Sequence, residues 1–509
     1  MNLTFQKFLV SFITKNGSKR ILKESENGIN IQYKTLKYLL KKAEFTSFGK
    51  EYNFNKIKTY NDFKISIPVR NYEEFFPYIN RIRNGEHNVL WPQKITWFAK
   101  SSGTTNNISK YIPVSKDALY DCHFKAGKDM ISIYNNNFPS KNIYNGKGIM
   151  LGGSINTANQ KDYIDGDLSA ILIHKFPFWV NKHRVPDIET SLMQNWELKL
   201  EKIVNQSIKE NITNLTGVPS WMLILLKKVL EVSKKKNILE VWPNLEVYFH
   251  GGVNFEPYRE QFNTMIPSTS MNYLEGYNAS EGFFAVQDKN PSEGMLLLIN
   301  HGIFYEFFEV NKLNNSEKNI INIEDVQLDI NYAIIITTNS GLWRYMIGDV
   351  IKFISINPYR IKIVGRTKSF INTFGEELMV HNTDKAILET CKKLGCQIIE
   401  YTVAPIYIST KSGGHQWFIE FGKKPENLTG FINVLDKNLR SINSDYAAKR
   451  FKNLILKKPE IICLENNEFY IWLKNNNRLG GQIKIPRLNN DRIFAEEILS
   501  IHRSFQQND

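Results

Sequence analysis

The sequence predicts a mixed α/β protein with a large N-terminal part and a smaller C-terminal unit. Three observations support this prediction. Hydrophobic residues make up 42% of the 509 residues and aromatic residues 13%, which is typical of a folded chain with a large core. Helical apolar spacing alternates along the chain with short apolar strand patterns that end in small-residue turns. Beyond residue 370 a β-α-β-type alternation begins.

Helices are predicted in the N-terminal part where apolar residues recur three or four positions apart. These segments are residues 1–14, 33–43, 115–134, 191–208 and 221–232. Ser115 is a predicted N-cap. In the fourth segment the stripe that includes Trp196 and Ile203 indicates core packing. The basic run 234–236 follows the fifth segment and indicates a solvated helix C-terminus.

Strands are predicted where short apolar or alternating runs are bounded by turn residues. These runs are residues 95–99, 111–114, 148–151, 245–250, 271–274, 332–338 and 361–364. The third run ends in the pair Gly152-Gly153 and the fourth in Gly251-Gly252. Glycine turns at strand ends are common places for the edge of a ligand, so we expect a binding site near such ends.

A second domain is predicted from the order of its elements. A helix is expected over residues 384–394, strands near 401–408 and 416–421, and a helix over 428–442. This alternation is compact enough for a small domain. We therefore divide the chain into domains 1–367 and 368–509.

Charge and cysteine usage narrow the classes of function. The net charge of +14 favours anionic ligands, but Lys and Arg are dispersed, so a basic nucleic-acid-binding protein is only a distant alternative. The cysteines are too few for a disulfide framework and lack zinc-ligand spacing. They are Cys122, Cys391, Cys396 and Cys463. No apolar run is long enough to span a bilayer and no cleavage pattern follows the N-terminus, so we expect a cytoplasmic protein without a membrane partner. We also expect a monomer.

The turn between the first two predicted strands is rich in hydrogen-bond donors. Its residues are Ser101, Ser102, Gly103, Thr104 and Thr105. Backbone N–H groups, hydroxyls and the nearby Lys110 ammonium suit a polyanion such as a triphosphate. The spacing of a Walker A loop is absent. Taken alone, this turn is equally consistent with a phosphate cradle and with a polar hairpin.

Two later stretches also place unusual chemistry at strand ends. Residues 271–284 combine an aromatic, a hydroxyl and a carboxylate in one turn, and residues 341–351 follow a buried strand directly. With the hydroxyl-rich turn they resemble the Gretchen Hagen family of acyl-acid amido synthetases, members of the adenylate-forming superfamily. The segments that carry this resemblance, from about Phe76 to the C-terminus, are Ser101-Ser102-Gly103-Thr104-Thr105 with Lys110 and Pro113, Tyr277-x-Ala279-Ser280-Glu281-Gly282, Tyr345-x-x-Gly348-Asp349-Val350, Gly365-Arg366 and Gln482-Ile483-Lys484-Ile485-Pro486-Arg487.

The resemblance implies the adenylate-forming fold. This fold has a large N-terminal domain of β-sheets flanked by helices, a β-barrel-like subdomain, and a smaller mobile C-terminal α+β domain. It also implies the reaction: a carboxylic acid and ATP give acyl-AMP and pyrophosphate, and an amine, expected to be an amino acid, then attacks to give an amide. An acyl-CoA ligase or a carrier-protein loader shares the first step and is the nearest alternative.

The same resemblance assigns roles to single residues. ATP is bound by the hydroxyl-rich turn together with four later residues: Tyr277, Ala279, Ser280 and Asp349. Asp349 grips the ribose diol, and Glu281 is the protein ligand of Mg²⁺, which prefers one or two carboxylates plus phosphate oxygens. Read without the resemblance, Asp349 is an ordinary turn aspartate and Glu281 a charge that complements a helix N-terminus.

Three cationic residues are assigned in the same way. Lys484 bridges the carboxylate and the α-phosphate during adenylation, and Gly365-Arg366 marks the hinge about which the C-terminal domain rotates. Arg366 ranks above Arg344 as the cation that neutralises phosphate or pairs with Asp349. Without the resemblance, Lys484 is a solvent-exposed lysine shortly before a proline.

The chain departs from the plant members of the family. Asn106-Asn107 stands where plant members carry glycine, and residues 371–378 and 412–417 are similar to the bacterial branch. The acid and the amine therefore cannot be taken from plant hormones. His415 lies where it could act near the incoming amine, although a packing role is favoured, and His250 lies where the family lines its acyl pocket.

Overall fold

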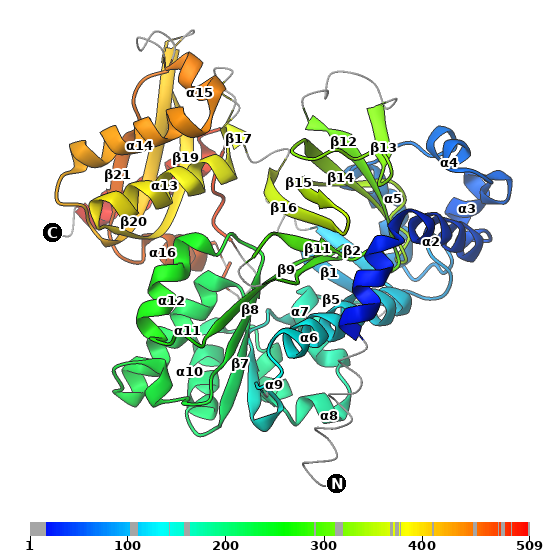
Figure 1. Ribbon diagram of the computed structural model, residues 1–509, viewed down its shortest axis with the longest axis horizontal. Helices are drawn as coiled ribbons and strands as arrows, with labels where there is room; N and C mark the ends of the chain where they lie inside the picture. The colour runs from blue at the N-terminus through cyan, green and yellow to red at the C-terminus, as the bar shows by residue number, and fades with distance from the viewer. Residues whose placement is uncertain are drawn as a thin grey trace. The chain divides into compact units, whose positions relative to one another are not determined.

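The computed structural model describes residues 17–101, 110–141, 143–156, 163–289, 292–310, 319–366, 370–371, 376, 378–409, 412–450, 456–476, 478–479, 484–489 and 491–506. These residues divide into two units (Figure 1). The first comprises the described residues up to Val253 together with Phe262–Ile363. The second comprises Asn254–Gln261, Val364–Leu479 and the described residues from 484 onwards.

The first unit is built on a large mixed sheet. In spatial order its described strands are β13 (Ile320–Asn322), β12 (Ile303–Glu309), β14 (Asn331–Thr338), β15 (Tyr345–Ile356), β16 (Tyr359–Arg366), β11 (Met295–Leu297), β10 (Gly282–Gln287), β9 (Asn272–Ala279), β8 (Val247–Gly251), β7 (Ile212–Gly217), β3 (Lys147–Met150) and β6 (Arg184–Val185). The neighbours from β6 to β9 run parallel. Beyond β9 the pairs with β10 and β11 are antiparallel, as are those from β13 to β15. Five predicted strands are confirmed here.

The other two predicted strands belong to a smaller sheet. Its order is β2 (Lys110–Val114), β1 (Trp97–Ser101), β5 (Ile164–Gly166) and β4 (Ile155–Asn156). β1 and β2 form an antiparallel hairpin in which Ser101 lies opposite Lys110. β1 also pairs in parallel with β5.

Helices flank both sheets in the first unit. They are α2 (Gly28–Ala43), α3 (Ser47–Glu51), α4 (Tyr60–Ser66), α5 (Tyr72–Arg83), α6 (Lys125–Asn137), α7 (Leu168–Lys175), α8 (Phe178–Asn181), α9 (Ile188–Leu192), α10 (Trp196–Ser207) and α11 (Pro219–Ser233). The residues of α12 (Arg259–Met265) are divided between the two units at Phe262. The Ser115 hydroxyl accepts a hydrogen bond from the Ala118 amide at 2.9 Å, which confirms the predicted cap. A π-helical turn (Ala118–Phe124) follows and leads into α6. The predicted helix over residues 1–14 lies outside the described residues.

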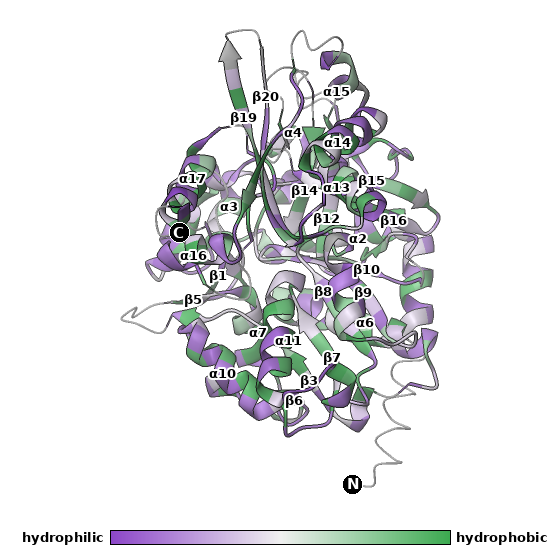
Figure 2. Ribbon diagram, turned by 90° about the vertical axis from the view of Figure 1, so that its left-hand side faces the viewer, coloured by the Kyte–Doolittle hydropathy of each residue, from purple (hydrophilic) through white to green (hydrophobic). Residues whose placement is uncertain are grey.

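The helix predicted over residues 191–208 is two helices. α9 ends at Leu192, and α10 begins after Asn195, whose side chain accepts from the Leu198 amide at 2.9 Å. The single-helix prediction was wrong because Asn195 is a strong N-cap, which interrupts the apolar stripe. The packing of Trp196 and Ile203 in the core is confirmed. Figure 2 shows the mixture of hydrophilic and hydrophobic residues along α10.

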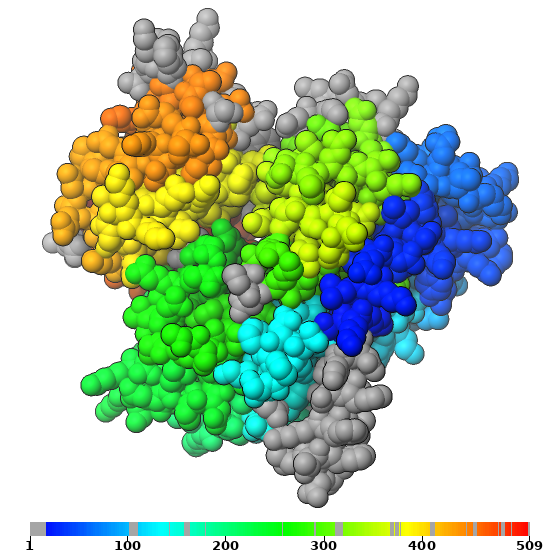
Figure 3. Space-filling model, viewed as in Figure 1, coloured from blue at the N-terminus to red at the C-terminus, as the bar shows by residue number. Residues whose placement is uncertain are grey.

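The N-terminal helix α2 packs against a strand that comes much later in the chain. The Gln32 amide donates to the carbonyls of Ile299 and Ile303 at 2.8 and 2.9 Å, and its oxygen accepts from the Tyr305 amide at 2.8 Å. Gln32 therefore continues the hydrogen-bonding pattern of β12. Figure 3 shows the blue α2 segment at the surface beside the yellow-green strands.

The second unit has its own sheet and core. β19 (Gln397–Ser409) and β20 (Ser412–Lys423) are antiparallel, and β21 (Glu460–Leu464) is parallel to β20. The short pair β17 (Phe370–Ile371) and β18 (Leu378–Met379) precedes them. Its helices are α13 (Val380–Leu394), α14 (Leu428–Ile442), α15 (Ser444–Lys449), α16 (Glu468–Asn475) and α17 (Ile493–Gln506). The predicted helices and strands of this unit are confirmed. Among the described residues of both units, no helix is long and apolar enough to cross a bilayer.

Candidate active site

The parallel half of the large sheet brings several turns to one edge. The carboxyl ends of β3, β7, β8 and β9 lead into Gly152, Gly217, Gly251 and Ala279. Gly217 pairs with His250, and Gly251 with Gly276, so these ends are neighbours in the sheet. Ligands of α/β proteins bind outside the carboxyl ends of parallel strands. This edge is therefore the candidate site.

Two predicted site residues meet at this sheet. The Tyr277 hydroxyl on β9 donates to Asp349 Oδ2 on β15 at 2.6 Å. Both side chains are buried, with 5% and 8% of their surface exposed. The second and third motifs, 72 residues apart in the chain, are thereby joined by a charge-assisted hydrogen bond.

A bulge in β15 sets the direction of the Asp349 side chain. Ala333 pairs with Val350 and Ile335 with Met346, so the residues between Met346 and Val350 exceed those opposite them on β14. Gly348 has φ of +92°, a left-handed conformation that glycine adopts readily. β-Bulges redirect side chains next to active sites. Asp349 is therefore a residue of a distorted strand, and the prediction of an ordinary turn aspartate does not describe it.

Ser280 and Glu281 form the turn between β9 and β10. Ala279 pairs with Gly282 across this hairpin, which leaves these two residues as the turn. Both are half-buried, and no helix begins at Glu281, so the reading of a helix N-terminal charge is wrong. No group of three metal-ligating side chains occurs among the described residues. A single carboxylate beside substrate phosphates fits the modest protein coordination that Mg²⁺ takes, so Glu281 suits this ion.

The hydroxyl-rich turn has the flanking structure that the sequence predicts. Ser101 ends β1 and Lys110 begins β2. The Lys110 ammonium lies 5.5 Å from the centre of the Tyr72 ring, and the Tyr72 hydroxyl accepts from the Tyr111 amide at 2.8 Å. Four predicted phosphate-binding residues lie outside the described residues: Ser102, Gly103, Thr104 and Thr105.

From the sequence, Arg344 is the lower-ranked candidate for the cation that neutralises phosphate, but the structure gives it a structural role. Its side chain is fully buried and its Nε lies 2.9 Å from Glu306 Oε2. One of its terminal nitrogens donates to the carbonyls of Lys64 and Ile67 at 3.0 and 2.6 Å. Burial raises the pKa of Glu306, and the charge of Arg344 opposes that rise. The pair fastens the segment around α4 to the sheet.

Arg344→Met is expected to lower the free energy of unfolding by about 3–5 kcal/mol, because Glu306 would remain as an unpaired buried charge. Urea unfolding followed by circular dichroism measures this loss. The matched control is Arg81→Met, which breaks the exposed pair with Glu86 and should cost less than about 1 kcal/mol. If Arg344→Met loses no more free energy of unfolding than Arg81→Met does, the structural role of Arg344 is contradicted.

The remaining predicted cations belong to the second unit. Arg366 ends β16 and is half-buried, while Lys484 is exposed. The segment after Lys484 is held to β19, because Thr402 donates to the Pro486 carbonyl at 2.6 Å and Leu488 bridges to Val403. The motif lysine therefore extends from an anchored segment.

The two histidines noted in the sequence are both buried. His415 Nε2 lies 2.8 Å from Glu376 Oε1 and the side chain is 1% exposed, which confirms the packing role. His250 lies in β8 at the carboxyl edge of the parallel strands, 5.5 Å from the Tyr248 ring centre. It therefore stays a candidate pocket residue.

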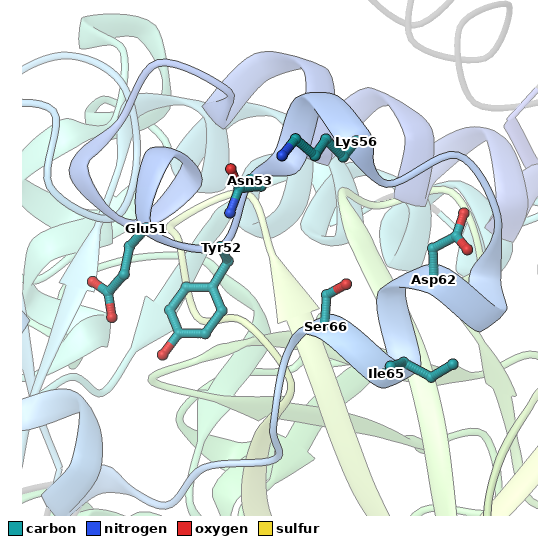
Figure 4. Close-up of a pocket in the computed structure, with 7 residues that line it drawn as sticks. All are labelled: Glu51, Tyr52, Asn53, Lys56, Asp62, Ile65 and Ser66. Atoms are coloured by element: carbon teal, nitrogen blue, oxygen red, sulfur yellow. The ribbon is translucent and has the colours of Figure 1, made fainter.

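Two further features escape sequence analysis. Lys199 on α10 is buried, although lysines are ordinarily exposed to solvent. It lies three residues after Trp196 and four before Ile203, so it falls on the apolar stripe of the helix, and this position is the sequence signal of its burial. A pocket of about 400 Å³ also lies between α3 and α4 (Figure 4). None of its lining residues belongs to a motif: they are Glu51, Tyr52, Asn53, Lys56, Asp62, Ile65 and Ser66.

Comparison with protein families matches nearly the whole described chain. Residues 17–271 match the GH3 family N-terminal domain, residues 296–366 its central domain and residues 381–493 its C-terminal domain. The indole-3-acetic acid-amido synthetase GH3.4 of Arabidopsis thaliana is 23% identical over 91% of this chain and 89% of its own length. The jasmonoyl–L-amino acid synthetase JAR6 of Nicotiana attenuata is 23% identical over 94% of this chain and 95% of its own.

Solved structures share the fold. The GH3.15 acyl acid amido synthetase superposes with a TM-score of 0.78 at 17% identity, over 95% of this chain and 94% of that one. A 2-hydroxyisobutyryl-CoA ligase in the postadenylation state reaches 0.57 at 11% identity, over 96% and 92%. These matches confirm the predicted α/β adenylate-forming fold. With three family domains matched in order, this chain belongs to the GH3 family of acyl acid amido synthetases.

Proposed function

We propose that this enzyme uses ATP to convert a carboxylic acid to acyl-AMP and pyrophosphate, and then joins the acyl group to the amino group of an amino acid. The observation that carries the proposal is the hydrogen bond between Tyr277 and Asp349, which unites two motifs at the edge where the parallel strands end. Membership of the GH3 family supports both steps, because the matched relatives are named as amido synthetases.

Nucleotide binding follows from the chemistry of this pair. A carboxylate offers about four lone-pair sites, so Asp349 can accept hydroxyl donors in addition to Tyr277. A ribose diol supplies two such donors. The Tyr277 hydroxyl holds the carboxylate in one orientation. Ala279 ends the same strand and Ser280 begins the turn after it, and both are proposed to lie beside the phosphates. In this proposal Asp349 binds the ribose.

Attack of the acid on the α-phosphate builds charge on the phosphates, and donors aimed at them stabilise the transition state. The residues proposed as donors are those of the hydroxyl-rich turn, Ser101, Ser102, Gly103, Thr104 and Thr105. Mg²⁺, held by Glu281, would supply further charge neutralisation. The Glu281 carboxylate lies in the hairpin turn directly after the residues that adjoin the ribose site.

The second unit is proposed to complete the site. Lys484 would neutralise charge between the attacking carboxylate and the α-phosphate, and Arg366 would bind phosphate at the start of this unit. A hinge is proposed at Gly365, because glycine, which has no Cβ, can absorb large changes in φ and ψ. The boundary between domains 1–367 and 368–509 is part of the same proposal.

The alternative is transfer of the acyl group to coenzyme A or to a carrier protein. One observation favours it: the fold is shared with a CoA ligase at a TM-score of 0.57. Both reactions start from acyl-AMP, which has a good leaving group, so neither needs a covalent enzyme nucleophile. The dispersed positive charge gives no support to nucleic-acid binding. A monomer located in the cytoplasm also belongs to this proposal.

The products distinguish the two reactions. The enzyme is incubated with ATP, Mg²⁺ and pooled carboxylic acids, with CoA and mixed amino acids offered together. We expect acyl-amino acid amides in the mass spectrum, and one molecule of pyrophosphate for each amide. An exclusive thioester product would support the CoA ligase, and absence of acid-dependent pyrophosphate release would contradict adenylation itself.

A further inference from the structure

Lys199 is a buried ammonium whose donors all have acceptors. Its side chain on α10 is 2% exposed. The Nζ atom lies 2.8 Å from the Gly152 carbonyl, 2.7 Å from that of Gly153 and 2.6 Å from that of Ser191. An ammonium has three donors, so the site is fully matched. Burial lowers the pKa of Lys199 to about 8, against the opposing charge of Asp167.

The turn that Lys199 contacts is held from its other side as well. The Gly153 amide donates to the Ser169 hydroxyl at 3.0 Å, and the Ser154 amide donates to Asp167 Oδ2 at 2.8 Å. A Cβ on Gly153 would lie 1.9 Å from the same Asp167 oxygen, so a larger residue would displace the Asp167 side chain. The Gly152–Ser154 turn is therefore fixed through both its carbonyls and its amides.

This turn joins the two sheets that carry the motifs. It begins at the carboxyl end of β3, in the parallel half of the large sheet, and leads directly into β4 of the smaller sheet. Through β5, β4 is linked to β1, which ends at Ser101. At its start, the Leu151 amide donates to the Thr216 carbonyl of β7 at 2.9 Å. A shift of the turn would move one sheet relative to the other.

We propose that Lys199 is a positioning residue for adenylation. It fixes the Gly152–Ser154 turn, which forms a wall of the carboxylic acid site, and thereby fixes the position of the phosphate-binding hairpin relative to that site. The inference rests on the proposed function, because it concerns the acid and ATP of that reaction. Lys199 touches neither substrate. It acts through backbone carbonyls at the edge where ligands of parallel sheets bind.

Lys199→Met keeps the length of the side chain and removes its charge and donors. We expect the KM for the acid in the pyrophosphate-release assay to rise about tenfold while kcat changes by less than about threefold, because a loosened wall weakens binding in the ground and transition states alike. The matched control is Lys202→Met, a half-buried lysine one helical turn further along α10, for which we expect both constants to be unchanged.

Hydrogen–deuterium exchange of residues 150–156 gives a readout that needs no turnover. Exchange should accelerate there in Lys199→Met and stay unchanged in β12. If this variant does not fold, Ser169→Ala removes the acceptor of the Gly153 amide and should raise the same KM and the same exchange. Unchanged exchange and KM in the folded variant would overturn the inference. If the wild-type enzyme shows no acid-dependent pyrophosphate release, the proposed function is contradicted. The hydrogen–deuterium exchange of residues 150–156 would then be the measurement that tests whether Lys199 holds the turn.

Discussion

Replacing Lys484 by alanine is expected to reduce acid-dependent pyrophosphate release by about 100- to 1,000-fold, the usual cost of removing one donor aimed at charge that develops in a transition state. The ammonium is proposed to act only as charge develops between the carboxylate and the α-phosphate. ATP binding, measured by isothermal titration calorimetry, should therefore stay within about twofold of the wild-type value.

The anchored segment around Lys484 makes this variant a clean test. The side chain is exposed, while Ile485 and Leu488 pack into the unit, so alanine at position 484 should leave the unit folded. Lys437→Ala, which removes an exposed lysine from α14 of the same unit, is the matched control and should keep full activity. Normal pyrophosphate release by Lys484→Ala would remove this lysine from the mechanism.

Asp349→Asn is expected to weaken ATP binding by about 10- to 100-fold, equivalent to about 1.5–3 kcal/mol for hydrogen bonds to a charged acceptor. The asparagine oxygen can still accept from Tyr277, so the loss should fall on the ribose hydroxyls. Calorimetric titration with ATP and with 2′,3′-dideoxy-ATP measures it. The variant should bind the two nucleotides with similar affinity, whereas the wild type should prefer ATP.

A double-mutant cycle with Tyr277→Phe tests whether the pair acts as one unit. Removing the tyrosine hydroxyl should weaken ATP binding by about fivefold, and the double variant should lose less than the sum of the two single losses. The control is Asp329→Asn, an exposed aspartate with φ of +62°, a conformation that asparagine also adopts. Additive effects, or equal losses for the two nucleotides, would argue against ribose binding by Asp349.

The strands were the most predictable part of the fold. Residues 332–336 are an uninterrupted apolar run, and β14 occupies Asn331–Thr338 because such a run is stable only when both faces of a strand are buried. Helix limits were less predictable. Leu192 fits the apolar period of α10 but belongs to α9, because the capping of Asn195 outweighs periodicity.

The site was predictable as a set of motifs and not as a geometry. The resemblance to the GH3 family selected Tyr277 and Asp349, but their contact depends on a bulge at Gly348 that periodicity does not reveal. The role of Arg344 depends on Glu306, which looks in the sequence like one carboxylate among many. The position of Lys199 on the apolar stripe of α10 signals its burial, but its acceptors are backbone carbonyls, which no side-chain pattern encodes.

The contact between Gln32 and β12 has a consequence for biosynthesis. The carbonyl and amide partners of Gln32 lie 267 to 273 residues further along the chain. A ribosome that adds about 5–20 residues per second needs tens of seconds to produce them. Throughout that interval the apolar face of α2 lacks the strand against which it packs, so this early helix is buried late and chaperones have long access to it.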